Sequence, residues 1–529
     1  MGADTGSEFD YIVVGAGSAG CVLANRLTED ADVRVLLLEA GGPADNPNIA
    51  VPAAAAALWR TGVDWNFTTE PQKHLRERAL YWPRGKVLGG SSSINAMIYI
   101  RGHRADYDEW AGLGNPGWGY DDVLPYFKRA EDNARGADAY HGTGGPLRVE
   151  DPRWVSGLGR AFVEAGQAAG IPANNDFNGA EQDGVGVYQV TQKRGERWST
   201  FKAYLEPALG RANLTVRTHA LSHRVIVEGG RAVGVEFSHA GTVQTARATR
   251  EVLLCGGSVN SPQLLQLSGI GSADHLRELG IAVVADLPGV GENLQDHLVT
   301  DWSHRCDNGG LFEADRNPRN LIAYLARRKG PLTSVVAEVG GFVRTTPDLD
   351  APDLQFHFLP ALVDDLGART PHGHGWNIWP TLLRPLSKGT VRVRSTDPRW
   401  APAIDPNYLE APEDVEVLVR GLELSREIAA QAPMARHRGE RFHPPAGSDD
   451  DLAEYVRANC QTLFHPVGTC RMGVDELAVV DPELRVRGVD GLRVIDASVM
   501  PTVPRGNTNA PTIMVAEKAV DLMRAKVPA

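Results

Sequence analysis

The stretch FDYIVVGAGSAGCVLA, residues 9–24, joins an apolar strand pattern to a glycine-rich turn and then to a helical pattern. Gly15 permits a tight turn, Gly17 lets the backbone approach a pyrophosphate, and Gly20 lets the helix pack closely on the strand. The phosphates would meet the positive N-terminal end of that helix. A glycine-rich packing turn is the plain alternative. Because strand, turn and helix agree, the stretch predicts a dinucleotide-binding unit.

A second strand pattern, residues 33–38, follows this unit and ends at Glu39. The carboxylate lies about 20 residues after the glycine turn, where it can accept hydrogen bonds from a ribose. We therefore expect an α/β fold, α+β overall, that is built around a Rossmann-like domain.

The composition is that of a globular protein and disfavours several functional classes. Its 529 residues exceed one ordinary domain of roughly 100–200 residues, so we expect two domains. A net charge of −12 argues against a nucleic-acid partner, which would favour a basic face. The five cysteines are scattered with no CxxC pair, so we expect reduced thiols and neither a disulfide framework nor a metal site.

The sequence shows no targeting or membrane-spanning pattern. Residues 1–10 lack the basic and apolar regions of a signal peptide, and no stretch approaches the ~18 apolar residues of a membrane span. We expect a cytoplasmic protein with no integral membrane segment. Peripheral contact with a membrane quinone pool would leave no obvious trace in the sequence.

Two further glycine-rich stretches point to the same nucleotide-binding domain. Residues 83–99, PRGKVLGGSSSINAMIY, predict a phosphate-facing turn that opens a helix, although a serine-rich surface loop is the alternative. Residues 251–265, EVLLCGGSVNSPQLL, predict a buried strand, a glycine turn and a helix that starts at Ser261 and Pro262. Short strand patterns at 214–218, 225–227 and 233–235 predict an antiparallel sheet appended to the doubly wound sheet.

The pattern changes between residues 299 and 460. Residues 354–359 and 390–394 alternate as strands do, and 413–430 form an amphipathic helical pattern. A last strand pattern, 492–496, and a helix from Pro511 return the chain to the nucleotide-binding domain. We predict that this domain comprises residues 1–155, 210–298 and 461–529. We also predict a substrate-binding domain with an antiparallel sheet and helices, which comprises residues 156–209 and 299–460.

Together these motifs resemble the glucose-methanol-choline (GMC) oxidoreductase family over essentially the whole chain. Residues 85–99 look like its first signature and residues 257–271 like its second, while His465-Pro466 and the run Asn509-Ala510-Pro511-Thr512 look like its catalytic pair. The bacterial choline- and alcohol-dehydrogenase branch is the most similar. The resemblance implies FAD as the cofactor.

The resemblance also implies how FAD lies across the sheet. Val225 would touch the adenine, Asp496 the ribityl-pyrophosphate region, and Thr512 the underside of the flavin pyrimidine. Members with covalent FAD carry histidine directly before the asparagine of the first signature, where this chain has Ile94, so we expect non-covalent FAD. The residues implied to bind FAD are Gly15, Gly17, Ser18, Gly20, Glu39, Trp65, Val87, Gly90, Ser91, Asn95, Ala96, Met97, Ile98, Val225, Asp496, Ala497 and Thr512.

Alcohol oxidation requires a base beside a hydride acceptor. His465 suits the base, because an unperturbed pKa near 6.5 leaves neutral imidazole available at physiological pH. The hydride would go to flavin N5, chemistry that the cofactor supplies. Asn509 would hydrogen-bond the same alkoxide. A structural role for His465 is the alternative.

Three residues are predicted to contact the substrate. His357 aligns with a substrate-pocket histidine of choline-oxidising relatives, but it could equally be a satisfied core residue. Glu338 aligns with a carboxylate that holds trimethylammonium there, although a glutamate is also compatible with uncharged substrates. Phe464 adjoins His465.

The resemblance predicts FAD-dependent oxidation of primary alcohols to aldehydes. A choline-type oxidase or dehydrogenase, a lyase or photodecarboxylase of the same fold, and a flavoprotein used only for binding are the alternatives. Oxygen and a quinone or dye remain open as electron acceptors, and we favour a dehydrogenase. The sequence leaves the particular alcohol and the oligomeric state open.

Overall fold

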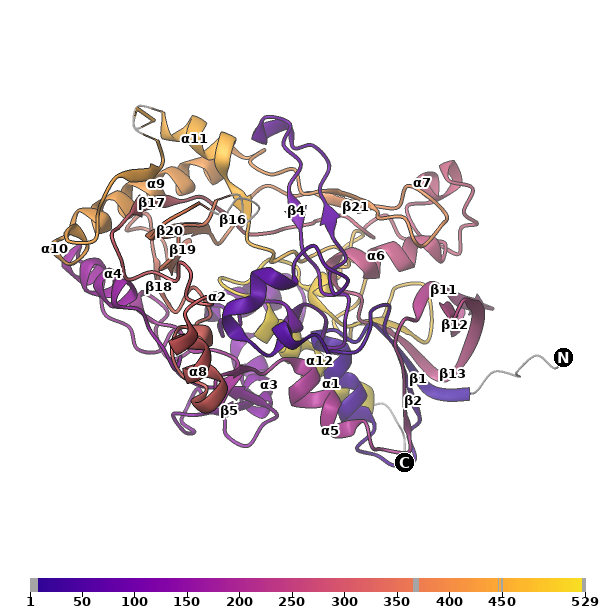
Figure 1. Cartoon of the computed structure of the whole chain (residues 1–529). Helices are drawn as coiled ribbons and strands as arrows, with labels where there is room; N and C mark the ends of the chain where they lie inside the picture. Colours follow the sequence, from indigo (N-terminus) through magenta and orange to yellow (C-terminus); the bar gives the residue numbers. More distant parts are fainter. Residues whose placement is uncertain (1–7, 365–370, 446, 449–450, 526–529) are drawn as a thin grey trace.

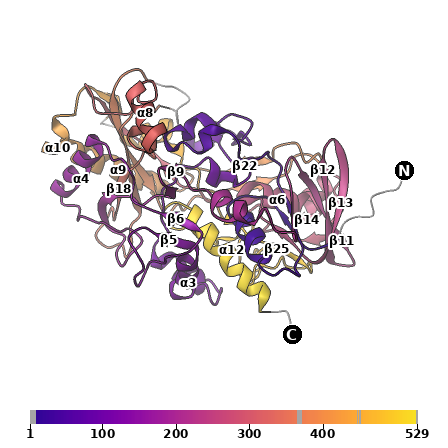
Figure 2. The ribbon, with the colours of Figure 1, turned by 60° about the horizontal axis from the view of Figure 1, so that its bottom comes forward.

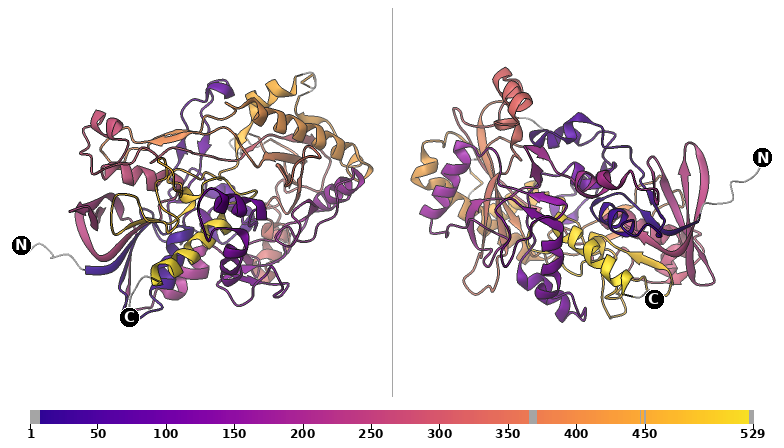
Figure 3. Two further views of the ribbon diagram at one scale, coloured as in Figure 1. Left: turned by 180° about the vertical axis from the view of Figure 1, so that it is seen from behind. Right: turned by 90° about the horizontal axis from the view of Figure 1, so that it is seen from below.

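Two large sheets lie side by side in the computed structural model, which describes residues 8–364, 371–445, 447–448 and 451–525 (Figure 1). Residues 1–7, on which much of the targeting prediction rests, lie outside the described residues. Seen from behind and from below, the magenta strands of the first sheet and the orange helices beside the second sheet lie at opposite ends (Figure 3). The predicted α/β class is confirmed.

Strand β1 (Glu8–Val14) occupies the centre of the first sheet, as its apolar sequence predicts. It pairs in parallel with β2 (Val35–Leu38) and with the end of β13 (Thr242–Leu254). Residues 11–14 are all buried, as expected for a parallel strand that helices cover on both faces. The other strands of this sheet are β10 (Leu214–Arg217), β11 (Leu221–Glu228), β12 (Arg231–His239) and β25 (Leu492–Val494).

One predicted strand joins the sheet differently. β11 and β12 form an antiparallel ribbon with the first half of β13, which confirms that part of the prediction. The sequence also predicted β10 in this antiparallel ribbon. That prediction is wrong, because β10 pairs in parallel with β2. Asn213 fixes this placement: its side-chain amide donates to the Val33 carbonyl at 2.8 Å, and its own carbonyl accepts the Val35 amide at 2.9 Å. An alternating pattern predicts a strand but not its partner.

The turn between β1 and the first helix needs glycine, because the backbone segments there approach one another closely. α1 (Ser18–Leu27) starts directly after Gly17. A Cβ on Gly20 would lie 1.9 Å from the Gly15 carbonyl oxygen, and a Cβ on Gly15, at φ +99°, would lie 2.5 Å from the Cys255 carbonyl oxygen. The turn therefore closes only with glycine at both positions. α12 (Asn509–Arg524) packs against α1. Figure 2 shows α12 in yellow, running from the middle of the molecule towards the C-terminus.

The helix predicted after the serine run does not form. Residues 90–93 make a single 3₁₀ turn, η4 (Gly90–Ser93), and the chain after it is irregular. The Ser92 and Ser93 hydroxyls donate to the carbonyls of Gly89 and Leu88 at 2.6 and 2.8 Å. Serine side chains that bond nearby backbone in this way compete with helix formation.

α6 (Gly257–Leu267) starts four residues earlier than predicted and holds Pro262 in its interior. Proline at that position leaves the Ser258 carbonyl without its helical donor. The Thr469 hydroxyl takes the place of that donor at 2.8 Å. A contact from a residue 211 positions away therefore makes the longer helix possible.

The second sheet is antiparallel at every pairing, which confirms the predicted antiparallel sheet with helices. α9 (Pro412–Ala430) and α4 (Gly157–Ala168) pack on it around buried aromatic side chains such as Phe162 and Phe358. Its strands are β7 (Gly184–Val187), β16 (Leu298–Val299), β17 (Trp302–Arg305), β18 (Val339–Val343), β19 (Leu354–Leu359), β20 (Gly375–Leu382), β23 (Arg441–His443) and β24 (Gln461–Thr462).

The pattern at 390–394 forms β21 (Thr390–Arg392) in a separate small pair with β22 (Ala403–Asp405). β16 and β24 lie at the predicted domain limits, residues 298 and 461, and pair with each other in the second sheet. The domain limits themselves stay a prediction. The further helices include α2 (Arg104–Gly112), α3 (Tyr120–Ala130), α5 (Glu206–Ala208), α7 (Ala273–Glu278), α8 (Pro318–Arg327), α10 (Ala432–Ala435) and α11 (Leu452–Asn459). Of the helices in the described ranges, none combines the length and apolar character needed to cross a bilayer.

Candidate active site

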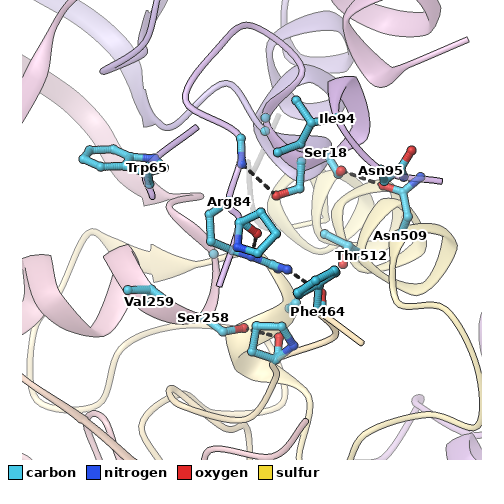
Figure 4. Close-up of a pocket in the computed structure, with 18 of the residues that line it drawn as sticks. Ser18, Trp65, Arg84, Ile94, Asn95, Ser258, Val259, Phe464, Asn509 and Thr512 are labelled. Atoms are coloured by element: carbon cyan, nitrogen blue, oxygen red, sulfur yellow. Dashed lines mark hydrogen bonds between the residues drawn. The ribbon is translucent and has the colours of Figure 1, made fainter. Parts of the chain in front are cut away.

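A cavity of about 420 Å³ lies between the two sheets (Figure 4). Its lining includes the glycine turns after β1 and β13, together with the first residues of α1, α6 and α12. It also includes residues 335–337 before β18, part of β19 and residues 463–466. A cavity that draws on both sheets is a usual place for a ligand.

Two predicted carboxylates bind the glycine turns that line the cavity. Glu39 accepts the backbone amides of Ala16 and Gly41 at 2.8 and 2.7 Å, one on each oxygen. Burial raises the pKa of Glu39 to about 7. Asp496 accepts the Gly257 amide at 2.8 Å and the Ser261 hydroxyl at 2.6 Å through one oxygen. Each carboxylate oxygen has two lone pairs, so both groups keep acceptor capacity for a ribose or ribityl hydroxyl.

The backbone around Gly17 leaves the space that a pyrophosphate needs. A Cβ on Gly17 would have only the Cys255 carbonyl oxygen within 4 Å, at 3.9 Å, whereas a Cβ on Gly90 would lie 2.6 Å from the Gly17 Cα. No side chain caps the start of α1, so its first amides are available as donors to an anion. Open space beside uncapped amides fits a dinucleotide.

Most residues predicted to bind FAD line this cavity; the exceptions are Gly20, Val87 and Val225. Gly20 lies behind the turn against Gly15. Val87 is buried in a small apolar cluster. The Val225 amide donates to the Ser268 hydroxyl at 2.8 Å, and residues 220–222 line the cavity instead. The individual FAD contacts stay predictions.

His465 lines the cavity and is held from three sides. Its backbone amide donates to Asp296 Oδ1 at 2.7 Å. Its ring Nδ1 lies 3.0 Å from His297 Nδ1, and its Nε2 lies 3.2 Å from the amide nitrogen of Asn507. The preceding residue, Phe464, has φ +68°, a left-handed conformation that costs energy in a residue with a side chain. The ring is therefore fixed with Nε2 at the cavity.

Burial keeps this histidine neutral. Desolvation lowers the pKa of His465 well below 6.5, and His297, His357 and Arg84 lower it further. Arg84 lies at the cavity wall and donates from Nη2 to the Phe464 carbonyl at 2.5 Å (Figure 4). An imidazole that is neutral at pH 7 is in the state that a general base requires.

The amide beside His465 is not the predicted one. Asn509 lines the cavity, but its Oδ1 accepts the Ser18 hydroxyl at 2.7 Å (Figure 4). Asn507 is the residue that contacts Nε2. Sequence reasoning missed Asn507 although it lies two residues away in the same run, GNTNAPT. It also missed His297, because the distance between 297 and 465 along the chain hides their contact.

The predicted substrate residues divide into two groups. His357 and Phe464 line the cavity, whereas Glu338 does not. His357 Nδ1 lies 3.2 Å from the Thr381 hydroxyl, and burial lowers the pKa of His357 to about 3. Glu338 bonds the Ser334 hydroxyl, and burial raises its pKa to about 8. The apolar residues of the lining include Val335, Val336, Ala337, Leu359, Val363 and Trp379.

Comparisons with known proteins identify the class. Residues 9–299 and 385–516 match the two models of the GMC oxidoreductase family. The chain is 48% identical to an alcohol dehydrogenase [acceptor] from Pseudomonas putida, covering 98% of this chain and 96% of that one. It is 46% identical to mitochondrial choline dehydrogenase from Homo sapiens, covering 99% and 91%. The chain therefore belongs to the GMC oxidoreductase family, as its motifs predicted.

Solved structures agree with this assignment. A pyridoxine 4-oxidase from Mesorbium loti superposes with a TM-score of 0.90 at 33% identity, covering 98% of this chain and all of that one. An FAD-dependent oxidoreductase from Chaetomium thermophilum gives 0.89 at 26% identity, covering 98% and 99%. The family and these relatives support FAD as the cofactor that the cavity fits. Within the residues that the structure describes, no three His, Cys, Asp or Glu side chains gather as metal ligands do.

We predict that Gly17→Val folds normally but does not retain FAD. The added Cβ has only the Cys255 carbonyl oxygen within 4 Å, so we expect the new side chain to fill the space that the pyrophosphate needs without disturbing the turn. The flavin absorption of the purified protein and its circular dichroism would check this. Gly62→Val is the matched control, since a Cβ there also meets nothing within 4 Å but Gly62 lies outside the cavity. A Gly17→Val protein with full flavin content would place the pyrophosphate elsewhere.

Proposed function

We propose that this protein oxidises primary alcohols to aldehydes, with FAD as the hydride acceptor and His465 as the general base. The observation that carries the proposal is the buried, neutral His465, whose Nε2 faces a cavity that also holds the dinucleotide turn. Both groups that alcohol oxidation requires therefore meet in one space. Membership of the GMC family supports this chemistry.

The chain's own residues would act on the substrate oxygen. Nε2 of His465 accepts the hydroxyl proton while the hydride leaves the adjacent carbon. A side-chain amide, from Asn507 or from the predicted Asn509, donates to the developing alkoxide. Bound FAD supplies the hydride acceptor at N5. The first residues of α12, including Thr512, line the cavity, so the positive end of this helix would stabilise negative charge on the reduced cofactor.

The cavity lining favours an uncharged substrate. Among the described residues of the lining, only Glu39 and Asp496 are acidic, and both accept backbone amides of the glycine turns. Glu338 lies outside the lining, and its raised pKa keeps it protonated at neutral pH, so it offers a cation no charge. Choline is the second candidate, because a relative with 46% identity is a choline dehydrogenase.

We predict that anaerobic mixing of the holoenzyme with benzyl alcohol or hexanol bleaches the flavin band faster than mixing with choline. Choline would have to bury its ammonium against a lining whose described carboxylates, Glu39 and Asp496, already bind the glycine turns, which is unfavourable. Stopped-flow absorbance measures each rate, and the unreactive tertiary alcohol tert-butanol is the control. A faster reaction with choline would favour the choline-type activity. No bleaching with any alcohol would exclude alcohol oxidation and leave a lyase, a photodecarboxylase or a binding role.

The electron acceptor is part of the same proposal. We propose a quinone or a dye-like acceptor rather than oxygen, in keeping with the acceptor-dependent relative from Pseudomonas putida. Reoxidation of the reduced enzyme, compared between air and an anaerobic quinone analogue, separates the two.

We predict that His465→Ala slows flavin reduction by the preferred alcohol by about 10²–10⁴-fold, the usual effect of losing a general base. The bound flavin spectrum should stay near normal, because the base acts on the substrate. Loss of the amide that bonds the alkoxide should cost about 10–10²-fold. Comparing Asn507→Ala with Asn509→Ala therefore shows which amide that is. A near-native rate in His465→Ala would make His357 the next candidate for the base.

We predict that FAD is released by acid precipitation. Ile94 occupies the position of the attachment histidine and lines the cavity, and its alkyl side chain cannot form the link (Figure 4). Yellow supernatant over colourless pellet is the expected result, and free FAD in the supernatant can be measured by its fluorescence. Flavin that stays with the pellet would show a covalent bond through another residue.

A further inference from the structure

The His465 ring contacts a second histidine that the proposed mechanism does not use. Nδ1 of His297 lies 3.0 Å from Nδ1 of His465, and Nε2 of His297 lies 3.1 Å from the Leu383 carbonyl oxygen. We propose that His297 is a positioning residue that holds the His465 proton on Nδ1, so that Nε2 is always the free base. This inference rests on the proposed function and adds a residue to it.

The protons of His297 follow from its partners. A carbonyl oxygen can only accept, so the contact with Leu383 requires a proton on His297 Nε2. Burial lowers the pKa of His297 to about 3, so the ring carries a single proton at neutral pH. Nδ1 of His297 is therefore a lone pair that faces His465.

The same argument then fixes His465. A lone pair on His297 Nδ1 accepts a hydrogen bond only if His465 carries its own proton on Nδ1. Nε2 of His465 is then a lone pair, which the Asn507 amide nitrogen contacts as a donor at 3.2 Å. The opposite tautomer would place two lone pairs 3.0 Å apart, and turning the Asn507 amide would not relieve that contact.

The backbone gives this contact little freedom. Asp296 accepts the backbone amide of His465, and His297, the residue after Asp296, contacts the His465 ring. The His297 carbonyl also accepts the Leu463 amide at 2.9 Å, and β16 pairs with β24 directly beside it. The His297 side chain is fully buried. One short segment therefore sets both the position and the tautomer of the base.

A neutral histidine beside the catalytic base acts differently on that base from the carboxylate of a catalytic triad. In a Ser-His-Asp triad the carboxylate orients the imidazole and also stabilises the imidazolium that forms. His297 can orient His465 but adds no negative charge. The pair therefore fixes the base while leaving it neutral, in agreement with the lowered pKa of His465.

The tautomer can be observed directly in holoenzyme labelled with ¹⁵N-histidine. We expect the ring signals that disappear in His465→Gln to show a proton on Nδ1 and a lone pair on Nε2 at pH 7. His297→Leu should mix the two tautomers. His297→Asn should keep the native one, because its Oδ1 can replace Nδ1 as the acceptor. A wild-type His465 with its proton on Nε2 would overturn the proposal.

Kinetics with the preferred alcohol complete the test. We expect His297→Leu to slow flavin reduction at least about 10-fold, below the about 10²–10⁴-fold of losing the base itself. Flavin content and thermal unfolding should stay near wild type, and His297→Asn should recover most of the rate. Equal losses in His297→Leu and His297→Asn would refute a role through the tautomer. If His465→Ala is slow but His297→Leu is not, the positioning role fails alone, whereas a fast His465→Ala would remove the proposed function itself.

Discussion

The backbone contact between the turn after β1 and the end of β13 is the constraint on which the rest of the structure depends. Gly15 and Gly20 bring strand, helix and neighbouring strand to distances that a Cβ would prevent, 2.5 Å and 1.9 Å from carbonyl oxygens. This approach leaves the uncapped start of α1 at the cavity, beside the first residues of α6 and α12. Three helix N-termini in one cavity create a positive potential before any cofactor is bound.

The last helix of the chain, α12, stabilises this arrangement of helix N-termini. Glu517 of α12 is fully buried and pairs with Arg26 of α1 at 2.8 Å and with Arg129 of α3 at 2.9 Å. The Tyr204 hydroxyl donates to the same carboxylate at 2.9 Å. A buried carboxylate with this many donors has its desolvation largely offset, and losing it would leave Arg26 paired only with Glu29 and Arg129 only with Asp521. The last helix is thereby fixed beside the first, with its N-terminus at the cavity.

The predictions from sequence were most successful where one local pattern specifies the structure. The turn at residues 15–20, the strands β1 and β19 and the helix α9 were predicted because spacing alone reports strand or helix. Predictions failed where a distant residue decided the outcome. β10 joined β2 because Asn213 ties it there, and α6 extended through Pro262 because Thr469 completes its hydrogen bonds. Neither partner is visible in a local window of sequence.

The same distinction between local pattern and distant contact applies to the residues of the candidate site. The sequence by itself determined the family, the dinucleotide turn and His465 as the candidate base, because these depend on residue types at fixed spacing. Only the tertiary structure brought His297 and Asn507 to the two ring nitrogens of His465, kept Glu338 out of the cavity lining and placed Asn509 against Ser18. The physical reason is that side-chain hydrogen bonds and desolvation depend on which groups meet after folding, and residues as far apart as 18 and 509 meet only then.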